Sequence, residues 1–331
     1  MWGVGKQAHT PLSTSDPFFL YFGSMSLARR LLIRASRSPW LAEQFRRRSF
    51  AKRAVRRFMP GEDLDSALDA AAKFAADNIG AVLTELGEQV TSRDEADAVR
   101  RHYLQVLAQV GRRRLGSHIS VKVTHLGLET DPAGCHRAVA ELAARAKAAG
   151  SLLWIDMEES RYVDQTLDVY RSARGSGADV GIALQAYLRR TPKDLETLLP
   201  LKPWIRLVKG AYSEPAHIAF PKKSDVDAAY FDLAGRLLGE AAKGRATPIF
   251  GTHDEPLIER IRGRAAELKA ARGSYEIHML YGIRSDAQRR LAKEGERVRV
   301  LISYGSAWFA WYMRRLAERP ANIWFVVRNL I

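Results

Sequence analysis

The segment with the clearest chemical character is an apolar run that ends in cations. Residues 204–212 read Trp-Ile-Arg-Leu-Val-Lys-Gly-Ala-Tyr. This pattern predicts a buried strand whose end brings Arg206, Lys209 and the small Gly210-Ala211 step to one place. Cations beside backbone that carries no bulky side chain can hold a flat, anionic ligand. We therefore predict an anion-binding site at the end of this strand.

A second group of cations lies near the C-terminus, in a segment of helical periodicity. Trp311, Arg314, Arg315 and Glu318 follow the spacing i, i+3, i+4 and i+7 and therefore share one helical face. Paired guanidinium groups are well suited to bidentate capture of a carboxylate. The alternative is a surface arginine pair with Glu318 as its partner within the helix. Convergence of this face with the strand ends favours the carboxylate site.

The elements that must position these residues are short apolar runs separated by segments of helical period. After Pro60-Gly61 there are eight such runs, at residues 81–85, 118–123, 152–156, 180–185, 204–209, 247–251, 275–279 and 298–302. Eight strand and helix units over about 250 residues predict an α/β fold of the (β/α)8 TIM-barrel type. A doubly wound open sheet is the alternative, but no Gly-x-Gly-x-x-Gly follows the first run.

Most of these runs end in a polar or ionisable residue. The residues at or next to the run ends are Lys122, Asp156, Gln185, Lys209, Thr252, His253, Glu276 and His278. In a barrel, the carboxyl ends of the strands converge on the face where the active site lies. Residues far apart in the sequence would then share one pocket.

Several classes of chemistry lack support in the sequence. The carboxylates of residues 156–159 could suit Mg²⁺ or Mn²⁺, but Lys122, Arg206 and Lys209 would crowd the same pocket with positive charge. We therefore expect no metal site. His253 and His278 are equally compatible with plain core positions, and no HExxH or Gly-x-Ser-x-Gly occurs. A bound cofactor is the expected source of reactivity.

Charge is distributed unevenly along the 331 residues, which carry a formal net charge of +15. Residues 29–57 hold eleven Lys or Arg and one acid, interleaved with apolar residues. We predict a basic amphipathic helical arm over residues 25–60, a disordered extension over 1–24, and a catalytic barrel over 61–331. The arm has three interpretations: a solvated outer helix face, a surface for anionic lipid, or a nucleic-acid surface.

Seven motifs together resemble one family. They lie at residues 120–127, 155–160, 184–188, 206–212, 252–254, 279–282 and 314–318, and they are similar to those of the bacterial single-function proline dehydrogenases. The resemblance implies a barrel that holds FAD, with FMN less favoured. It also implies oxidation of L-proline to Δ1-pyrroline-5-carboxylate by hydride transfer to flavin N5, with electrons passed to a membrane quinone.

The resemblance assigns roles to individual residues. Lys122, Arg314 and Arg315 would hold the substrate carboxylate, Asp156 would orient Lys122 or Arg315, and Glu88 would be a gate that pairs with Arg314. Tyr212 and Leu280 would line the substrate ring. The residues expected near the flavin are Met157, Ala183, Gln185, Arg206, Lys209, Gly210, Ala211, Thr252, His253, Asp254, His278 and Glu318, with Lys222 and Lys223 at its pyrophosphate or adenosine end.

The chain departs from the family pattern at the substrate wall. Leu301 and Ser303 replace the usual Tyr and Pro, Trp311 replaces a Tyr, and His278 stands where Gln is usual. Another cyclic or N-substituted amino acid, such as hydroxyproline or pipecolate, is therefore an alternative substrate. A non-catalytic barrel that binds a flavin or an anionic metabolite is the second alternative.

The expected partners follow from these assignments. They are a small amino-acid substrate, a membrane quinone as electron acceptor, and anionic lipid in contact with residues 25–58, and we expect no nucleic-acid partner. Cys135 is the single cysteine, which fits a reducing compartment. We predict a cytoplasmic protein that is peripheral on the inner face of the membrane.

Overall fold

The computed structural model describes residues 55–309, 312 and 313. The chain divides into two compact units, of which one comprises residues 56–306 and the other residues 1–55 and 307–331. The first unit contains all the strands and helices named below. The predicted arm over residues 25–60, and the extension before it, lie almost wholly outside the described residues, so these boundaries stay predictions.

Eight parallel strands close into a barrel. They are β1 Gly80–Glu85, β2 His118–Val121, β3 Leu153–Ile155, β4 Val180–Gln185, β5 Trp204–Val208, β6 Thr247–Gly251, β7 Glu276–Leu280 and β8 Val298–Tyr304. Each strand pairs with its neighbour in sequence, and β8 pairs with β1 from Gly80 opposite Arg299 to Glu85 opposite Tyr304. The predicted (β/α)8 barrel is therefore confirmed, because in an open sheet the first and the last strand would not pair with each other.

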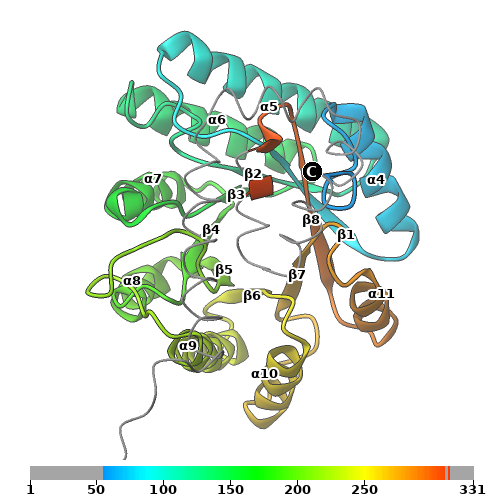
Figure 1. Cartoon of the computed structure of the whole chain (residues 1–331), viewed down its shortest axis with the longest axis vertical. Coiled ribbons are helices and arrows are strands. Elements are labelled where there is room, and N and C mark those ends of the chain that lie inside the picture. The colour runs from blue at the N-terminus through cyan, green and yellow to red at the C-terminus, as the bar shows by residue number, and fades with distance from the viewer. Residues whose placement is uncertain (1–54, 310–311, 314–331) are drawn as a thin grey trace, which may run out of the picture. The chain divides into compact units, whose positions relative to one another are not determined.

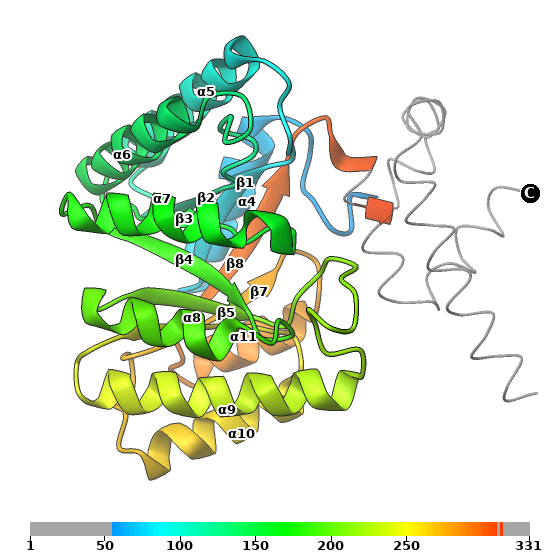
Figure 2. The ribbon, with the colours of Figure 1, turned by 90° about the vertical axis from the view of Figure 1, so that its left-hand side faces the viewer.

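Helices surround the barrel, one before each strand (Figure 1). They are α4 Leu64–Ala76, α5 Arg93–Arg113, α6 Pro132–Ala148, α7 Val163–Gly175, α8 Thr191–Leu198, α9 Lys223–Ala242, α10 Glu255–Glu267 and α11 Ser285–Lys293, with 3₁₀ helices η1 Ser160–Tyr162 and η2 Leu199–Leu201. Figure 2 shows α9 and α10 side by side along the strands. Among the described residues, no helix is long and apolar enough to span a bilayer.

Local sequence explains where several helices begin. Ser92, Asp131 and Asp254 are the N-caps of α5, α6 and α10, and each side chain accepts a hydrogen bond from a backbone N–H of the first turn. Proline in the first turn of α6 and α10 has a suitable φ and does not need its missing N–H. These caps set the ends of the loops that follow β1, β2 and β6.

Two strands end two residues away from the position that the sequence predicts. The second strand ends at Val121 and not at residue 123, because residues 122–128 fold into tight turns in which Leu126 N donates to Lys122 O at 3.2 Å. The eighth strand continues two residues beyond the predicted end, to Tyr304, because it pairs with β1 along its whole length. Lys122 is thus the first residue after its strand.

The two faces of the barrel wall pack differently. Leu83, Ile155 and Phe250 belong to the large apolar core that they share with helix residues such as Leu142. Their strand neighbours Val82, Trp154 and Ile249 form a separate cluster with Leu152, Trp204 and Leu301. Because adjacent residues of a strand point to opposite faces, the large core lies outside the wall and the small cluster inside it.

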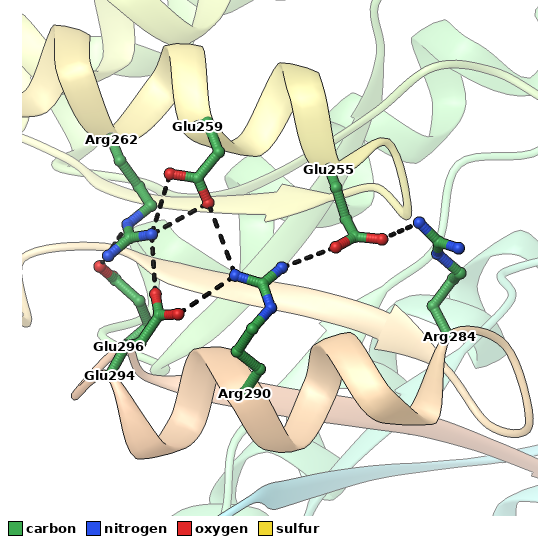
Figure 3. A network of polar contacts seen from close by, with 7 residues as sticks. All are labelled: Glu255, Glu259, Arg262, Arg284, Arg290, Glu294 and Glu296. Atoms are coloured by element: carbon green, nitrogen blue, oxygen red, sulfur yellow. Dashed lines mark hydrogen bonds and ion pairs between the residues drawn. The ribbon is translucent and has the colours of Figure 1, made fainter.

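An ion-pair network joins α10 to α11 (Figure 3). Glu255, the first residue of α10, contacts Arg284 and accepts from Arg290 Nη2 at 2.6 Å. Arg262 contacts Glu259, Glu294 and Glu296 at 2.9 to 3.0 Å. Glu255 follows the N-cap Asp254 directly, so the network holds the helix start that borders the carboxyl end of β6.

Candidate active site

A buried guanidinium lies at the centre of the barrel. Arg206 extends inward from β5 and is 4% exposed. Its Nη2 donates to Ser120 Oγ at 2.8 Å and forms an ion pair with Asp156, which follows β3. The Cζ atom lies 5.0 Å from the centroid of the Trp154 ring. Burial lowers the pKa of Arg206, and the Asp156 carboxylate opposes that shift.

The second terminal nitrogen of this guanidinium has a different environment. Arg206 Nη1 is buried and has no hydrogen-bond partner among the described residues. Asp156, Ser120 and Trp154 therefore hold the group on one side and leave one donor available to a ligand. Asp156 was expected to orient Lys122 or Arg315, and the second of these lies outside the described residues. In the described part of the chain its ion pair is with Arg206, two strands away, and not with Lys122.

Lys122 provides a second cationic group, directly after the carboxyl end of β2. Its Nζ donates to Gly87 O at 3.0 Å and to Glu88 Oε2 at 3.2 Å, and its side chain is 16% exposed. The structure thus brings two predicted site residues, Lys122 and Glu88, together. The expected partner of Glu88, Arg314, lies outside the described residues.

A third cationic group lies at the ends of β5 and β6. Lys209 Nζ donates to Asp227 at 2.6 Å and to Asp254 at 2.8 Å, and Lys223 contacts the same two carboxylates. These lysines lower the pKa of Asp254, the hydrogen bond from Lys209 being the largest cause. Lys222 stands at the N-cap position of α9. Asp227 was not predicted, because only the start of α9 beside β5 brings it to the site.

Small residues allow close approach of backbone at this end of the barrel. Gly210 has φ +121°, and a Cβ on it would lie 2.2 Å from the ring of Tyr187. Ala211 follows it, and Tyr187 N donates to Lys209 O at 2.9 Å. The predicted Gly210-Ala211 step is therefore a position where a larger residue cannot fit without movement.

A buried histidine lies on the inner face of β7. His278 Nε2 lies 3.1 Å from Glu276 Oε2, and Glu276 also contacts Arg297 at 2.6 Å and Arg299 at 2.9 Å. Burial lowers the pKa of His278 to about 4, whereas its partners hold the pKa of Glu276 below the usual range against the effect of burial. A neutral imidazole beside an ionised carboxylate must donate through Nε2, so its buried, unpartnered Nδ1 is an acceptor.

The remaining predicted residues of the barrel also lie at the carboxyl ends of strands. Gln185 ends β4 and donates from Nε2 to Glu158 O at 2.9 Å, and Leu280 ends β7. Thr252 follows β6, and its backbone N donates to His278 O at 3.2 Å. Ala183 lies within β4, and the loops that follow β3, β5 and β6 carry Met157, Tyr212 and His253. Arg314, Arg315, Glu318 and Trp311 lie outside the described residues.

Sequence reasoning missed three contributors to this site. Trp154 was counted only as a strand residue, although its inward ring stacks on Arg206 and lies 5.6 Å from the His278 ring. Ser120 and Asp227 were missed as partners of Arg206 and Lys209. The signal for Trp154 and Ser120 was their strand parity, since both share the inward register of their strands.

The residues present fit a flavin. An unpartnered donor on Arg206 and an unpartnered acceptor on His278 flank Trp154 inside the barrel. Lys209 and Lys223 supply ammonium groups, which are paired with Asp227 and Asp254 here, and Gly210 allows close contact with backbone. A flat ring with both donors and acceptors, attached to phosphate, matches this set. No group of three or more potential metal ligands occurs among the described residues.

The fold is a (β/α)8 barrel that gathers charged side chains at the carboxyl ends of its strands, where barrel enzymes have their active sites. The family model described as proline dehydrogenase matches residues 67–328. Proline dehydrogenase 2 of Bacillus subtilis subsp. natto is 35% identical over 306 residues, which cover 92% of this chain and 99% of that protein. Proline dehydrogenase of Deinococcus radiodurans is 34% identical over 310 residues, 92% and 98% of the two chains.

A solved structure agrees in fold. Proline utilization A from Bdellovibrio bacteriovorus, inactivated by N-propargylglycine, superposes with a TM-score of 0.76 at 20% identity, over 89% of this chain and 36% of that one. The chain belongs to the proline dehydrogenase family. It is accordingly an oxidoreductase of proline catabolism, and membership of the family implies a flavin cofactor.

Proposed function

We propose that this chain binds FAD and oxidises L-proline to Δ1-pyrroline-5-carboxylate, and that its electrons pass to a membrane quinone. The observation that carries the proposal is the arrangement at Arg206. This guanidinium is fixed by Asp156, Ser120 and Trp154, and one of its nitrogens has no partner among the described residues. The flavin, when bound, supplies the acceptor for a hydride from the ring carbon next to the proline nitrogen.

The chain's own residues would contribute binding and charge. Arg206 places a fixed positive charge where negative charge develops, and such preorganised groups stabilise a transition state without reorganising. Lys122 would bind the substrate carboxylate together with Arg314 and Arg315, which the sequence places on one helical face. Fixing the carboxylate orients the ring carbon for transfer, and orientation alone contributes a large part of many rate enhancements.

FAD is proposed over FMN because of the charge at the start of α9. Lys209 and Lys223 meet Asp227 and Asp254 there, and Lys222 stands at the cap position. These two ammonium groups could bind the two phosphates of FAD, whereas FMN offers only one phosphate. Chromatography of the flavin released by denaturation tests this directly, since recovery of FMN alone would contradict the proposal.

The test of the whole proposal is the visible spectrum before and after anaerobic addition of L-proline. We expect a flavin spectrum that bleaches on addition and recovers when a soluble quinone is supplied. A protein that cannot take up flavin would overturn the proposal. A flavin that stays oxidised with proline but bleaches with another amino acid would show that the other amino acid is the substrate.

A different substrate is the second candidate, and one observation favours it. Leu301 belongs to the inner cluster of the barrel wall, with Val82, Trp154 and Ile249. The family usually has a Tyr at this position, so the inner wall lacks a phenol. Hydroxyproline and pipecolate should therefore be compared with proline in one panel. A clear preference for proline, measured as kcat/KM, would remove this candidate.

The basic arm supplies a proposal for location. We infer that residues 25–58 dock the protein on anionic lipid at the inner face of the membrane, where a quinone is available. The inference rests on the cation-rich composition of residues 29–57. Flotation with vesicles that contain phosphatidylglycerol should recover the full chain and not a variant that lacks residues 25–58. Equal recovery of the two would contradict the inference.

A further inference from the structure

Glu158 is a buried carboxylate to which the proposed function gives no role. It lies in the loop after β3, two residues beyond Asp156, and is 2% exposed. Its Oε1 accepts from Thr124 N at 3.1 Å, and its Oε2 accepts from Thr124 Oγ1 at 2.5 Å. Burial raises the pKa of Glu158 to about 6. Two hydrogen bonds from Thr124, and to a lesser extent the charge of Lys122, oppose that shift and stabilise the ionised carboxylate.

Thr124 extends this contact to the loop after β1. Its Oγ1 accepts from Gln89 N at 3.1 Å, and its carbonyl oxygen accepts from Val90 N at 3.3 Å. The Thr124 hydroxyl donates its hydrogen bond to Glu158. Its oxygen can therefore accept a hydrogen bond from the backbone N–H of Gln89. The direction of the chain of hydrogen bonds is therefore set by the ionised carboxylate at its end.

The loop that is held in this way carries the two partners of Lys122. Gly87 O and Glu88 Oε2 accept from Lys122 Nζ at 3.0 and 3.2 Å, and Gln89 follows them with φ +55°. Gln89 therefore holds a backbone conformation that a non-glycine residue adopts rarely, next to the contacts with Lys122. Its hydrogen bond to Thr124 helps to keep it there.

The backbone of Glu158 is itself anchored to the barrel. Its carbonyl oxygen accepts from Gln185 Nε2 at 2.9 Å, and Gln185 is 2% exposed at the end of β4. Asp156, on the same loop, holds Arg206. The loop after β3 thus contacts Arg206 directly, through Asp156. It is linked to Lys122 only indirectly, from Glu158 through Thr124.

We propose that Glu158 is a positioning residue, which fixes the ammonium group of Lys122 for the substrate carboxylate by way of Thr124 and residues 87–89. The proposal rests on the proposed function, in which Lys122 binds that carboxylate. Glu158 itself touches neither Lys122 nor the substrate in this role. Its loss should therefore weaken substrate binding and leave the flavin and the hydride step in place.

The first experiment compares Glu158→Gln with Glu159→Gln in the flavin-loaded full chain. The amide keeps the size of Glu158 and can accept from Thr124 N, but its nitrogen cannot accept the hydroxyl proton. We expect the KM for L-proline to rise about ten-fold, with kcat within about two-fold and flavin content unchanged. Glu159 is a matched control, because it lies one residue away and pairs with Arg161 at 3.0 Å near the surface.

A second pair of variants tests the route through the hydroxyl. Thr124→Val removes Oγ1 at nearly constant shape, and Thr124→Ser keeps it. We expect the valine variant to show the same rise in KM as Glu158→Gln. The serine variant should have the KM of the parent. This pair also keeps the proposal testable if Glu158→Gln does not fold. Equal KM values for valine and serine variants would overturn the proposal.

A double-mutant cycle separates positioning from a general loss of stability. In a Lys122→Met background, Glu158→Gln should raise the KM for proline by less than about two-fold further, because the group that it positions is already absent. Additive effects, or a fall in kcat that matches a lower Tm, would show a purely structural role and overturn the proposal. If Lys122→Met alone leaves the KM unchanged, the assumed role of Lys122 is wrong, and the proposal for Glu158 falls with it.

Discussion

The two faces of the barrel wall are made from the same strands but perform different tasks. The outer face carries Leu83, Ile155 and Phe250 and packs on the helices, whereas the inner face carries Trp154, Arg206 and His278. Apolar burial outside supplies stability in proportion to the area removed from water. Inside, charged and aromatic groups are held by specific contacts. The comparison indicates that the fold depends on one face and the chemistry on the other.

The inner face is stable only as a connected set of contacts. Burying a charge is costly unless a partner compensates it, and removal of one partner costs more than loss of the pair. Arg206 has Asp156, and Glu276 has Arg297 and Arg299. The outer face depends less on specific pairs, since apolar burial is not directional and leaves no charge without a partner. Substitutions on the two faces should therefore have different consequences.

The largest effect should follow removal of the inner cation. Arg206→Met leaves Asp156 without its partner and removes the donor offered to the flavin. We expect a loss of about 3–5 kcal/mol in the free energy of unfolding, together with loss of most bound flavin. Flavin content is measured by the ratio of visible to ultraviolet absorbance after folding is checked by circular dichroism.

The control for this variant is Ser120→Ala. It removes one 2.8 Å hydrogen bond to Arg206 but keeps the ion pair with Asp156. We expect it to cost about 1 kcal/mol and to keep its flavin. Full flavin content in Arg206→Met would contradict the assignment of the cofactor site to the inner face.

A substitution on the outer face should affect stability alone. Leu142, in α6, is fully buried in the outer core. Leu142→Ala should lower the free energy of unfolding by about 3 kcal/mol, because it removes apolar contacts and leaves a cavity. Urea denaturation measures the loss. Flavin content per folded molecule should equal that of the parent, and a fall in that content would show that the two faces are coupled.

A carboxylate at the end of β1 should make stability depend on pH. Burial raises the pKa of Glu85 to about 7 from its ordinary value of 4.5. The folded state then binds this proton more tightly than the unfolded state, so the stabilisation is complete below pH 4.5 and is lost as pH rises to about 7. Relative to Glu85→Gln, the parent should lose about 2 kcal/mol between pH 5.5 and 8.5.

The measurement is chemical denaturation of parent and variant at both pH values. The difference between the two proteins removes the contribution of all other titrating groups. Glu85 lies near His102, whose Nε2 is 3.9 Å from Glu85 Oε1, and burial lowers the pKa of that histidine. A difference between the two proteins that stays constant with pH would mean that Glu85 is ionised throughout.

The smallest effect should come from the network between α10 and α11 (Figure 3). Arg290 contacts Glu255 at 2.6 Å and Glu294 at 3.1 Å, and its side chain is 45% exposed. Arg290→Gln should cost less than about 1 kcal/mol, because exposed ion pairs are screened by water and salt. Thermal denaturation at low and high salt measures this loss, which should shrink further at high salt. A loss that is larger and independent of salt would show that the network is structurally essential.

Much of the fold could be predicted because its pattern is local. Each strand was found from a short apolar run, and most of the runs had a polar residue at or next to their end. The placement of Lys122, Asp156, Gln185 and Lys209 at one end of the barrel followed from the topology alone. The ends of β2 and β8 were less accurate, since turns after Lys122 and pairing with β1 decide them.

Pairings within the site could not be predicted in the same way. Asp156 was expected to orient Lys122 or Arg315. Among the described residues it is paired with Arg206, because the register of β3 to β5 and the inward direction of β5 bring these two together. Asp227 reaches Lys209 only through the start of α9. Neighbouring strands offer several partners within reach of a long cationic side chain, and sequence spacing does not choose among them.

The amino-acid sequence by itself determined the number of strands, the barrel, the end at which polar residues gather, and the motifs of the proline dehydrogenase family. These properties depend on periodicity and on residue type, which the chain carries locally. The tertiary structure alone decided which charged side chains form pairs and that the Trp154 ring packs on Arg206. It also decided that hydrogen bonds through Thr124 connect Glu158 to the loop that holds Lys122. Such contacts join residues tens of positions apart, and only the closure of the barrel sets their distances.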